Sequence, residues 1–167
     1  MRFKYLACYL ASLLSITPCL AADDARPDPD ASGNILMIQV APGAIHFDSD
    51  PAHADFSWLV GVEWQKPSHW LAGYSYFNNS FDQKSQYIYA GYWWSISEKD
   101  PNWYVKLTGG VILGYKEPYE DKIPFNHNGV APGIVPALGY KMKRFNAQVN
   151  LLGTSGLMVT VGYDLIR

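Results

Sequence analysis

Past its first residues, the sequence lacks both cysteine and long apolar runs. Its two cysteines, Cys8 and Cys19, lie in the opening MRFKYLACYLASLLSITPCLAADD. The rest of the chain therefore offers no disulfide framework, no cysteine-based metal site and no thiol nucleophile. No later run approaches the roughly 18 continuous apolar residues of a membrane helix. The 4 histidines have no convincing metal-ligand spacing, so we expect neither a metal nor a cofactor.

The opening has the composition of a secretory signal peptide. Arg2 and Lys4 form a short positive region, an apolar stretch follows, and Leu20-Ala21-Ala22 offers small residues for cleavage. We therefore expect residues 1–22 to be a cleaved signal peptide and the protein to be exported. Lipidation at Cys19 is the weaker alternative, because a proline and a threonine precede it where small residues are expected.

The charge balance disfavours a nucleic-acid partner. Removing Arg2 and Lys4 with the signal peptide leaves 11 of the 13 basic residues against 15 acidic ones, a balance of about −4. Such a chain has no excess of cations with which to neutralise a phosphate backbone. The remaining length of about 145 residues fits one domain. Residues 23–33, DDARPDPDASG, form an acidic, proline-rich lead-in before it.

Aromatic residues are abundant, and they make up 15% of the chain, with 6 Trp and 12 Tyr. An exported chain without spanning helices but with many Trp and Tyr is typical of an outer-membrane β-barrel. In such barrels these residues form girdles at both membrane interfaces. A secreted, soluble β-sandwich is the alternative.

Strand-like segments separated by turn signals fill the sequence after the lead-in. They are 34–47, 56–66, 68–78, 85–96, 102–115, 129–141, 144–152 and 156–166. An even number of antiparallel strands can close with its ends meeting, and short turns alternating with long loops are typical of outer-membrane barrels. We therefore predict an all-β fold, an eight-stranded antiparallel outer-membrane β-barrel over residues 34–167.

Alternation within the segments supports this prediction. Trp58, Val60, Val62 and Trp64 share one face of their segment, and Ser57, Gly61, Glu63 and Gln65 share the other. In 156–166 the same period separates an apolar face from one that carries Asp164. The apolar face is expected toward lipid and the small or polar face toward the lumen, since a one-residue slip would put Glu63 and Asp164 into hydrocarbon.

Three prolines interrupt predicted strands: Pro42 in QVAPGAIHF, and Pro132 and Pro136 in GVAPGIVPALGY. Proline donates no hydrogen bond to a sheet and is confined to edges, strand starts or bulges. We predict that strands part at these positions. The alternative is that the prolines mark strand ends near loops.

Several of these stretches together resemble a known family. They are VAPGAIHF, the run GVEWQKPSHWLAGYSYFNNSFDQ followed by YAGYWW, and IVPALGY. They place a proline and a histidine on the first strand, a serine after the third, and prolines in the sixth. In this order the chain resembles the PagP-type lipid A palmitoyltransferases over most of residues 38–166.

The resemblance implies a location, substrates and an access route. The family works in the bacterial outer membrane and moves a palmitoyl chain from an outer-leaflet phospholipid to lipid A. Its substrates enter sideways through gaps at prolines, which implies substrate-binding roles for Pro42, Pro132 and Pro136. Phospholipid and lipid A are thus the expected partners of a membrane-embedded protein, which we expect to be a monomer.

The resemblance also implies catalytic residues, because the family requires a histidine, an aspartate and a serine. The histidine falls on His46 and the serine on Ser80, but the aspartate position holds Asn79. Asparagine can orient by hydrogen bonding, yet it cannot act as a carboxylate base. Asp82 or Asp48 could supply the charge. The bland alternative makes His46 an ordinary rim histidine and Asn-Asn-Ser an ordinary turn.

The loop YKEPYEDKIPFNHN, 115–128, mixes charges with aromatic residues. One interpretation is a lid in which Lys122 contacts sugar or phosphate headgroups, and the alternative is a solvated loop. For the whole protein, the first hypothesis is a phospholipid:lipid A palmitoyltransferase. Asn79 motivates the second, a non-catalytic barrel that binds or passes lipids. A lipid A deacylase is the third, although no His-x-Ser pair occurs on a late strand.

Overall fold

The computed structural model describes residues 33–47 and 57–167. The expected signal peptide, 1–22, and nearly all of the lead-in 23–33 lie outside the described residues. Within the described part, no helix is long and apolar enough to cross a membrane. One short 3₁₀ helix, η1 (Glu120–Lys122), lies in a loop.

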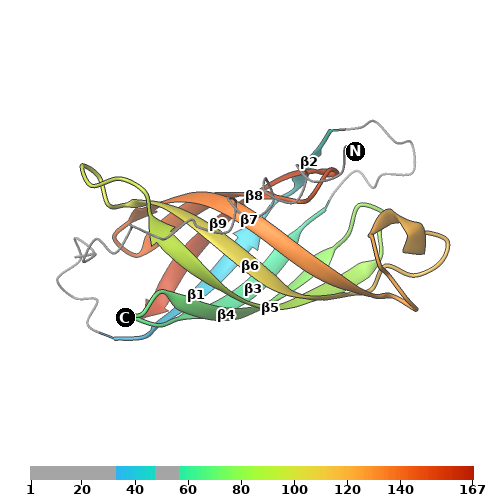
Figure 1. Ribbon diagram of the computed structural model, residues 1–167, viewed down its shortest axis with the longest axis horizontal. Coiled ribbons are helices and arrows are strands. Elements are labelled where there is room, and N and C mark those ends of the chain that lie inside the picture. Colours follow the sequence, from blue (N-terminus) through green and yellow to red (C-terminus); the bar gives the residue numbers. More distant parts are fainter. Residues whose placement is uncertain (1–32, 48–56) are drawn as a thin grey trace, which may run out of the picture.

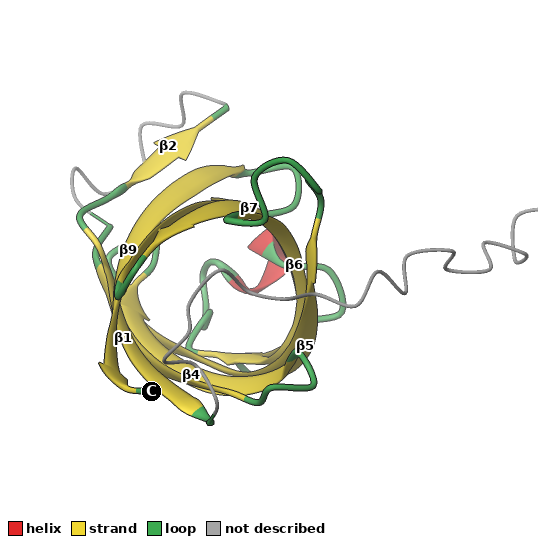
Figure 2. Cartoon of the chain, turned by 90° about the vertical axis from the view of Figure 1, so that its left-hand side faces the viewer, coloured by secondary structure: helices red, strands yellow, loops and turns green. Residues whose placement is uncertain are grey.

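The described strands form one closed antiparallel sheet (Figures 1 and 2). They are β1 (Ile35–Ala41), β2 (Ala44–His46), β3 (Leu59–Gln65), β4 (Trp70–Asn78), β5 (Lys84–Ser95), β6 (Trp103–Leu113), β7 (Val130–Met142), β8 (Phe145–Leu151) and β9 (Gly156–Ile166). β1 pairs with β3 on one side and with β9 on the other, which closes the barrel. β1 and β2 both pair with β9, one after the other, so together they occupy one of the eight strand positions of the barrel. The predicted eight-stranded antiparallel barrel is confirmed.

The barrel has two different ends. We call the end where β2 ends and β3 begins, and which carries the connections 79–83, 114–129 and 152–155, the loop end. The end that carries 66–69, 96–102 and 143–144 is the turn end. Figure 1 shows the loop end on the right, with η1, and the C-terminus at the opposite, turn end.

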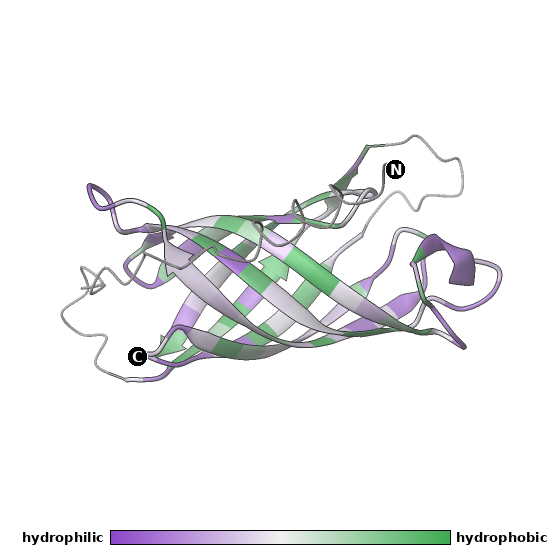
Figure 3. Cartoon of the chain, in the orientation of Figure 1, coloured by the Kyte–Doolittle hydropathy of each residue, from purple (hydrophilic) through white to green (hydrophobic). Residues whose placement is uncertain are grey.

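The strands alternate between lumen and surface as predicted. Glu63 and Asp164 lie inside and are 1% and 0% exposed, whereas Val60 and Val161 lie outside and are 46% and 45% exposed. In Figure 3 hydrophobic and hydrophilic bands mix along the strands, whereas the loops at the two ends are mostly hydrophilic. The outward positions are largely apolar, since many large hydrophobic residues of the strands are exposed. A shift of one residue in either strand would bury valine against the polar interior and expose a carboxylate.

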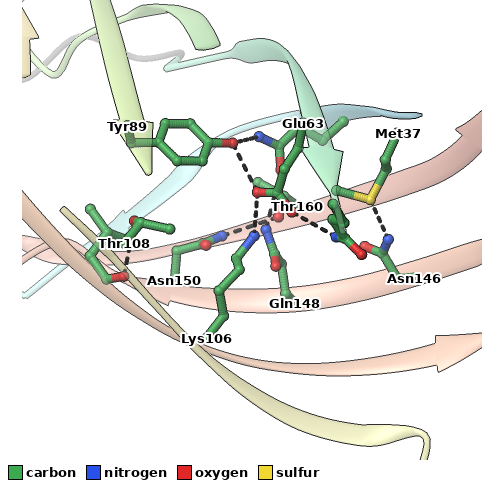
Figure 4. A network of polar contacts seen from close by, with 12 residues as sticks. Met37, Glu63, Tyr89, Lys106, Thr108, Asn146, Gln148, Asn150 and Thr160 are labelled. Carbon is green, nitrogen blue, oxygen red and sulfur yellow. Dashed lines mark hydrogen bonds and ion pairs between the residues drawn. The ribbon is translucent and has the colours of Figure 1, made fainter. Parts of the chain in front are cut away.

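Polar side chains cross the interior of the barrel in a connected network (Figure 4). Lys106 Nζ lies 2.9 Å from Glu63 Oε2, and Tyr89 donates its hydroxyl to the same oxygen at 3.0 Å. Gln39 Nε2 donates to Tyr89 Oη at 2.8 Å, and Gln148 Nε2 donates to Gln39 Oε1 at 3.3 Å. The buried charges are therefore paired and further hydrogen-bonded, which is what makes them tolerable inside a protein.

Aromatic rings fill another part of the interior. Tyr87 and Tyr89 stack with ring centroids 4.8 Å apart, and Leu71 and Trp93 belong to the same buried cluster. A side chain at Gly73 would collide with the ring of Tyr89, so a residue without Cβ is required opposite that ring.

The prolines of β7 lie where this strand leaves β8. β7 pairs with β6 from Val130 to Tyr140, but with β8 only from Ala137 onward. The Lys141 N–H donates to Asn102 O, on the β6 side, at 3.0 Å. Pro132 and Pro136 stand an odd number of residues from Lys141, so a hydrogen on their nitrogens would point toward the β8 side. The last pair joins Ala137 to Asn150 and β8 ends at Leu151, so the two prolines remove donors from the stretch of β7 that extends past the end of β8. Whether this end of the pairing is a gap that admits substrate stays a prediction.

Pro42 lies at a bulge between β1 and β2. Val40 pairs with Val161, and Ala44 pairs with Met158. The segment from β1 to β2 therefore has one residue more between these two pairs than β9 has. The sequence predicts one strand over 34–47, but the structure interrupts it at Pro42-Gly43 because this bulge breaks the ladder. Over the described residues β3 pairs with β1 and not with β2, which turns away from the ring of strands in Figure 2.

Candidate active site

His46 and Ser80 meet at the loop end. Nε2 of His46 lies 2.6 Å from Oγ of Ser80, although His46 ends β2, Ser80 lies in the turn after β4, and the two are 34 positions apart in sequence. Both side chains are half-buried. With the imidazole proton on Nδ1, Nε2 accepts the hydroxyl hydrogen, which is the arrangement of a serine beside its general base.

β9 places His46. His46 is the last residue of β2 and pairs with Gly156, and the next residue, Phe47, donates its N–H to Ser155 O at 3.0 Å. A side chain at Gly156 would collide with the carbonyl oxygen of Ile45, so glycine allows β2 to approach β9 closely. The pairing directs the imidazole toward the turn that carries Ser80.

A tight turn between β4 and β5 carries Ser80, and Asn79 organises it from within. Asn79 is 2% exposed, and its Oδ1 accepts the N–H groups of Phe81 and Gln83, both at 2.9 Å. Its Nδ2 donates to Ser85 Oγ at 3.1 Å. This amide therefore shapes the backbone on both sides of Ser80 and is saturated by its own turn.

Asp82 belongs to a second set of contacts in this turn. Its exposed carboxylate accepts from Asn78 Nδ2 at 2.6 Å, and Lys84 Nζ donates to Asn78 Oδ1 at 2.8 Å. The structure thus places Asp82 beside Asn78. Asp48, the other carboxylate considered for this role, lies outside the described residues.

The loop 114–129 packs against the turn. Lys122 lies on η1 with Nζ 5.5 Å from the ring centroid of Phe81, the residue after Ser80. Burial raises the pKa of Tyr115 in this loop to about 12, so its phenol stays neutral and packs as an apolar ring. Lys122 therefore packs against the residue that follows Ser80.

The three prolines flank the His46 side of the site. Pro42 lies at the bulge before β2, and Pro132 and Pro136 lie on the stretch of β7 that β8 does not pair with, so all three lie beside the group β8–β9–β2 at the loop end. In the described residues, no group of three or more His, Cys, Asp or Glu side chains could hold a metal ion.

Gln83, Phe81 and Tyr119 are site neighbours that the sequence does not mark. Gln83 bonds twice to the main chain of Lys116, and Phe81 stacks on Tyr119. These contacts join a turn and a loop whose sequences have no hydrophobic periodicity, so the sequence does not indicate which of their residues lie close together. The only local signal is the asparagine-rich turn itself.

No model of a known protein family matches this chain, and none of the curated proteins matches it. The functional argument therefore depends on the barrel, the His46–Ser80 pair and the interrupted strand pairing beside it.

Proposed function

We propose that this protein is an outer-membrane acyltransferase that moves a palmitoyl chain from a phospholipid to lipid A. The observation that carries this proposal is the 2.6 Å contact between His46 Nε2 and Ser80 Oγ, at the end of the barrel where the β7–β8 pairing stops and β2 follows a bulge. A serine activated by a base is the machinery of acyl transfer from an ester. Partings beside it offer a path for substrates that reside in the surrounding bilayer.

The outer surface supports placement in a membrane. Outward aromatic residues gather at the turn end, in the pairs Trp70–Tyr92, Trp103–Tyr140 and Phe145–Tyr163. Between the ends, the exposed surface is mostly aliphatic, with Tyr74 on β4 as an exposed aromatic residue. It includes Ile38, Val40, Val60, Val62, Ile88, Leu107, Val111, Ile134, Leu138, Val149, Val159 and Val161. An apolar band beside an aromatic girdle is the pattern of a transmembrane barrel, and a secretory leader is consistent with the bacterial outer membrane.

The chemistry proceeds through two ester exchanges. The Ser80 oxygen attacks the acyl carbon while His46 Nε2 accepts the hydroxyl proton, and the bond from the acyl carbon to the glycerol oxygen breaks. His46 returns the proton to the leaving lysophospholipid. A hydroxyl of lipid A then attacks the acyl-serine, again through His46, which finally reprotonates Ser80.

The filled interior disfavours passage of lipids through the barrel. Glu63, Lys106, Tyr89 and Gln39 form a bonded network across it, and breaking this network would strand buried charges. A barrel that only binds lipid without turnover remains the second candidate, because Asn79 stands where the related enzymes carry aspartate.

The test uses the purified mature protein in detergent with phospholipid and lipid A, and mass spectrometry of the products. We expect palmitoylated lipid A, and a loss of about 10²–10⁴-fold in rate for His46→Ala and for Ser80→Ala. His127→Ala and Ser68→Ala are matched controls, since both residues are exposed and lie away from the pair in sequence.

Three outcomes would overturn the proposal. Lipid binding without product would identify the non-catalytic barrel. Release of free fatty acid, with no more highly acylated lipid A, would identify a hydrolase. Full activity of Ser80→Ala would show that this serine is not the group that is acylated.

A further inference from the structure

Gln83 ties the Ser80 turn to the loop 114–129 by two hydrogen bonds. Its Nε2 donates to Lys116 O at 3.1 Å, and its Oε1 accepts the Lys116 N–H, also at 3.1 Å. A side-chain amide that pairs with both main-chain groups of one residue fixes position and orientation together. The link lies three residues beyond Ser80.

Phe81 provides the second link, directly after Ser80. Its ring stacks on Tyr119 with centroids 4.2 Å apart and planes at 16°, and Tyr115 meets it edge-on at 6.4 Å. Lys122 Nζ lies 5.5 Å from the centroid of the same ring. Aromatic pairs of this kind contribute beyond their buried area.

The loop is itself braced, so it can act as a fixed support. Asn126 Nδ2 donates to Tyr115 O at 2.7 Å and to Glu120 O at 3.0 Å. The Gly114 N–H donates to Gly129 O at 2.9 Å, which closes the loop at its base. Motion of this loop would therefore be transmitted to the turn through Gln83 and Phe81.

The two partners of the reactive pair are supported differently. Ser80 is held from inside by the amide of Asn79 and from outside by the loop. His46 ends a strand of three residues that follows a bulge. A serine held at a fixed position gives the imidazole a constant partner.

We propose that Gln83 and Tyr119 are positioning residues. Through the Gln83–Lys116 hydrogen bonds and the Phe81–Tyr119 stack, they fix the turn that carries Ser80 to the loop 114–129 and so hold the Ser80 hydroxyl at hydrogen-bonding distance from His46. This inference rests on the proposed acyl transfer for its effect on rate, but not for its effect on the hydrogen bond. Displacement of a reacting group by about 1 Å lowers turnover by up to about 10²-fold.

The first test measures kcat and KM of Gln83→Leu and Tyr119→Ala in the transfer assay. We expect kcat to fall by about 10- to 100-fold with little change in KM, because the variants displace the nucleophile and leave the lipid contacts in place. Tyr119→Phe keeps the stacked ring and should retain wild-type kcat. Gln86→Leu is the matched control, since Gln86 bonds to Tyr74 on the strand and not to the loop.

The second test reads the hydrogen bond without turnover, from the ¹⁵N resonance of His46 Nε2 in histidine-labelled protein. We expect Gln83→Leu and Tyr119→Ala to move this resonance toward its position in Ser80→Ala. Tyr119→Phe and Gln86→Leu should keep the wild-type position. A circular dichroism spectrum equal to that of the wild type establishes that each variant is a folded barrel.

A wild-type resonance in Gln83→Leu would overturn the inference, whatever the activity. An equal loss of kcat in Gln86→Leu would also overturn it, since the loss would then arise from a change in the strand and not from the missing contacts between the turn and the loop 114–129. If the wild-type protein transfers no acyl group, the proposed function fails, but the resonance still decides whether Gln83 and Tyr119 position Ser80.

Discussion

The turn end and the loop end of the barrel differ in strand pairing and in the side chains that meet there. At the turn end, β4 pairs with β5 from its first residue, β7 pairs with β8 to its last residue, and buried Asp164 binds Lys141 at 2.7 Å and Arg167 at 3.1 Å. At the loop end, β7 leaves β8, β2 follows a bulge, and His46 meets Ser80. We infer that the buried charge pairs of the turn half stabilise the barrel enough for strand pairing to be interrupted at the loop end.

The largest expected effect breaks the closed half. Glu63→Ala leaves Lys106 buried without its carboxylate and removes the acceptor of Tyr89. We expect the free energy of unfolding, measured by urea titration in detergent, to fall by about 3–5 kcal/mol.

The control for this variant replaces both charges. Glu63→Leu with Lys106→Met should restore most of the lost free energy, because an apolar pair needs no desolvation of charge. Equal urea midpoints for Glu63→Ala and the wild type would show that this network does not stabilise the closed half.

A smaller effect sharpens the open half. Pro132→Ala with Pro136→Ala adds two N–H groups on the β8 side of β7, and the register places Pro136 opposite Leu151, the last residue of β8, where the ladder can extend by one pair. We expect stability to rise by about 1 kcal/mol and kcat/KM for the phospholipid to fall several-fold. Pro67→Ala, in an exposed turn at the other end, is the control. Unchanged kcat/KM in a more stable double variant would separate the parting from substrate access.

The smallest effect concerns Asn79. A carboxylate there can accept the same two N–H groups, and the Ser85 hydroxyl can turn to donate to it. Asn79→Asp should therefore keep the turn, and its kcat should stay close to that of the wild type. Asn79→Leu leaves two N–H groups without their acceptor and should lower both stability and kcat. A large loss of kcat in Asn79→Asp would show that the amide does more than organise the turn.

The sequence predicts the strands better than it predicts the site. The period-two alternation places β9 at 156–166 as observed, and β7 within one residue of its observed ends, because a buried face and a lipid face impose opposite residue types. Pro42 indicates an interruption, but the residue at which the ladder resumes depends on the partner strand.

For the site, strand direction predicts that His46 and Ser80 share one rim, but their contact depends on the bend of β2 and on the turn built by Asn79. The roles of Asn79, Asp82, Lys122 and the prolines in catalysis and binding stay predictions. The hydrogen bonds between Gln83 and the main chain of Lys116 could not be predicted, since main-chain groups of an irregular loop have no sequence signature. Strands with a regular hydrophobic period can thus be predicted from the sequence, whereas contacts between loops depend on the whole fold.

The most direct test of the acyl-transfer proposal is mass spectrometry of lipid A from cells that produce either the wild-type protein or Ser80→Ala at equal levels in the outer membrane. We expect lipid A that has gained one palmitoyl group with the wild type, and unmodified lipid A with Ser80→Ala. Identical lipid A from the two strains would contradict the proposal that the His46–Ser80 pair performs acyl transfer.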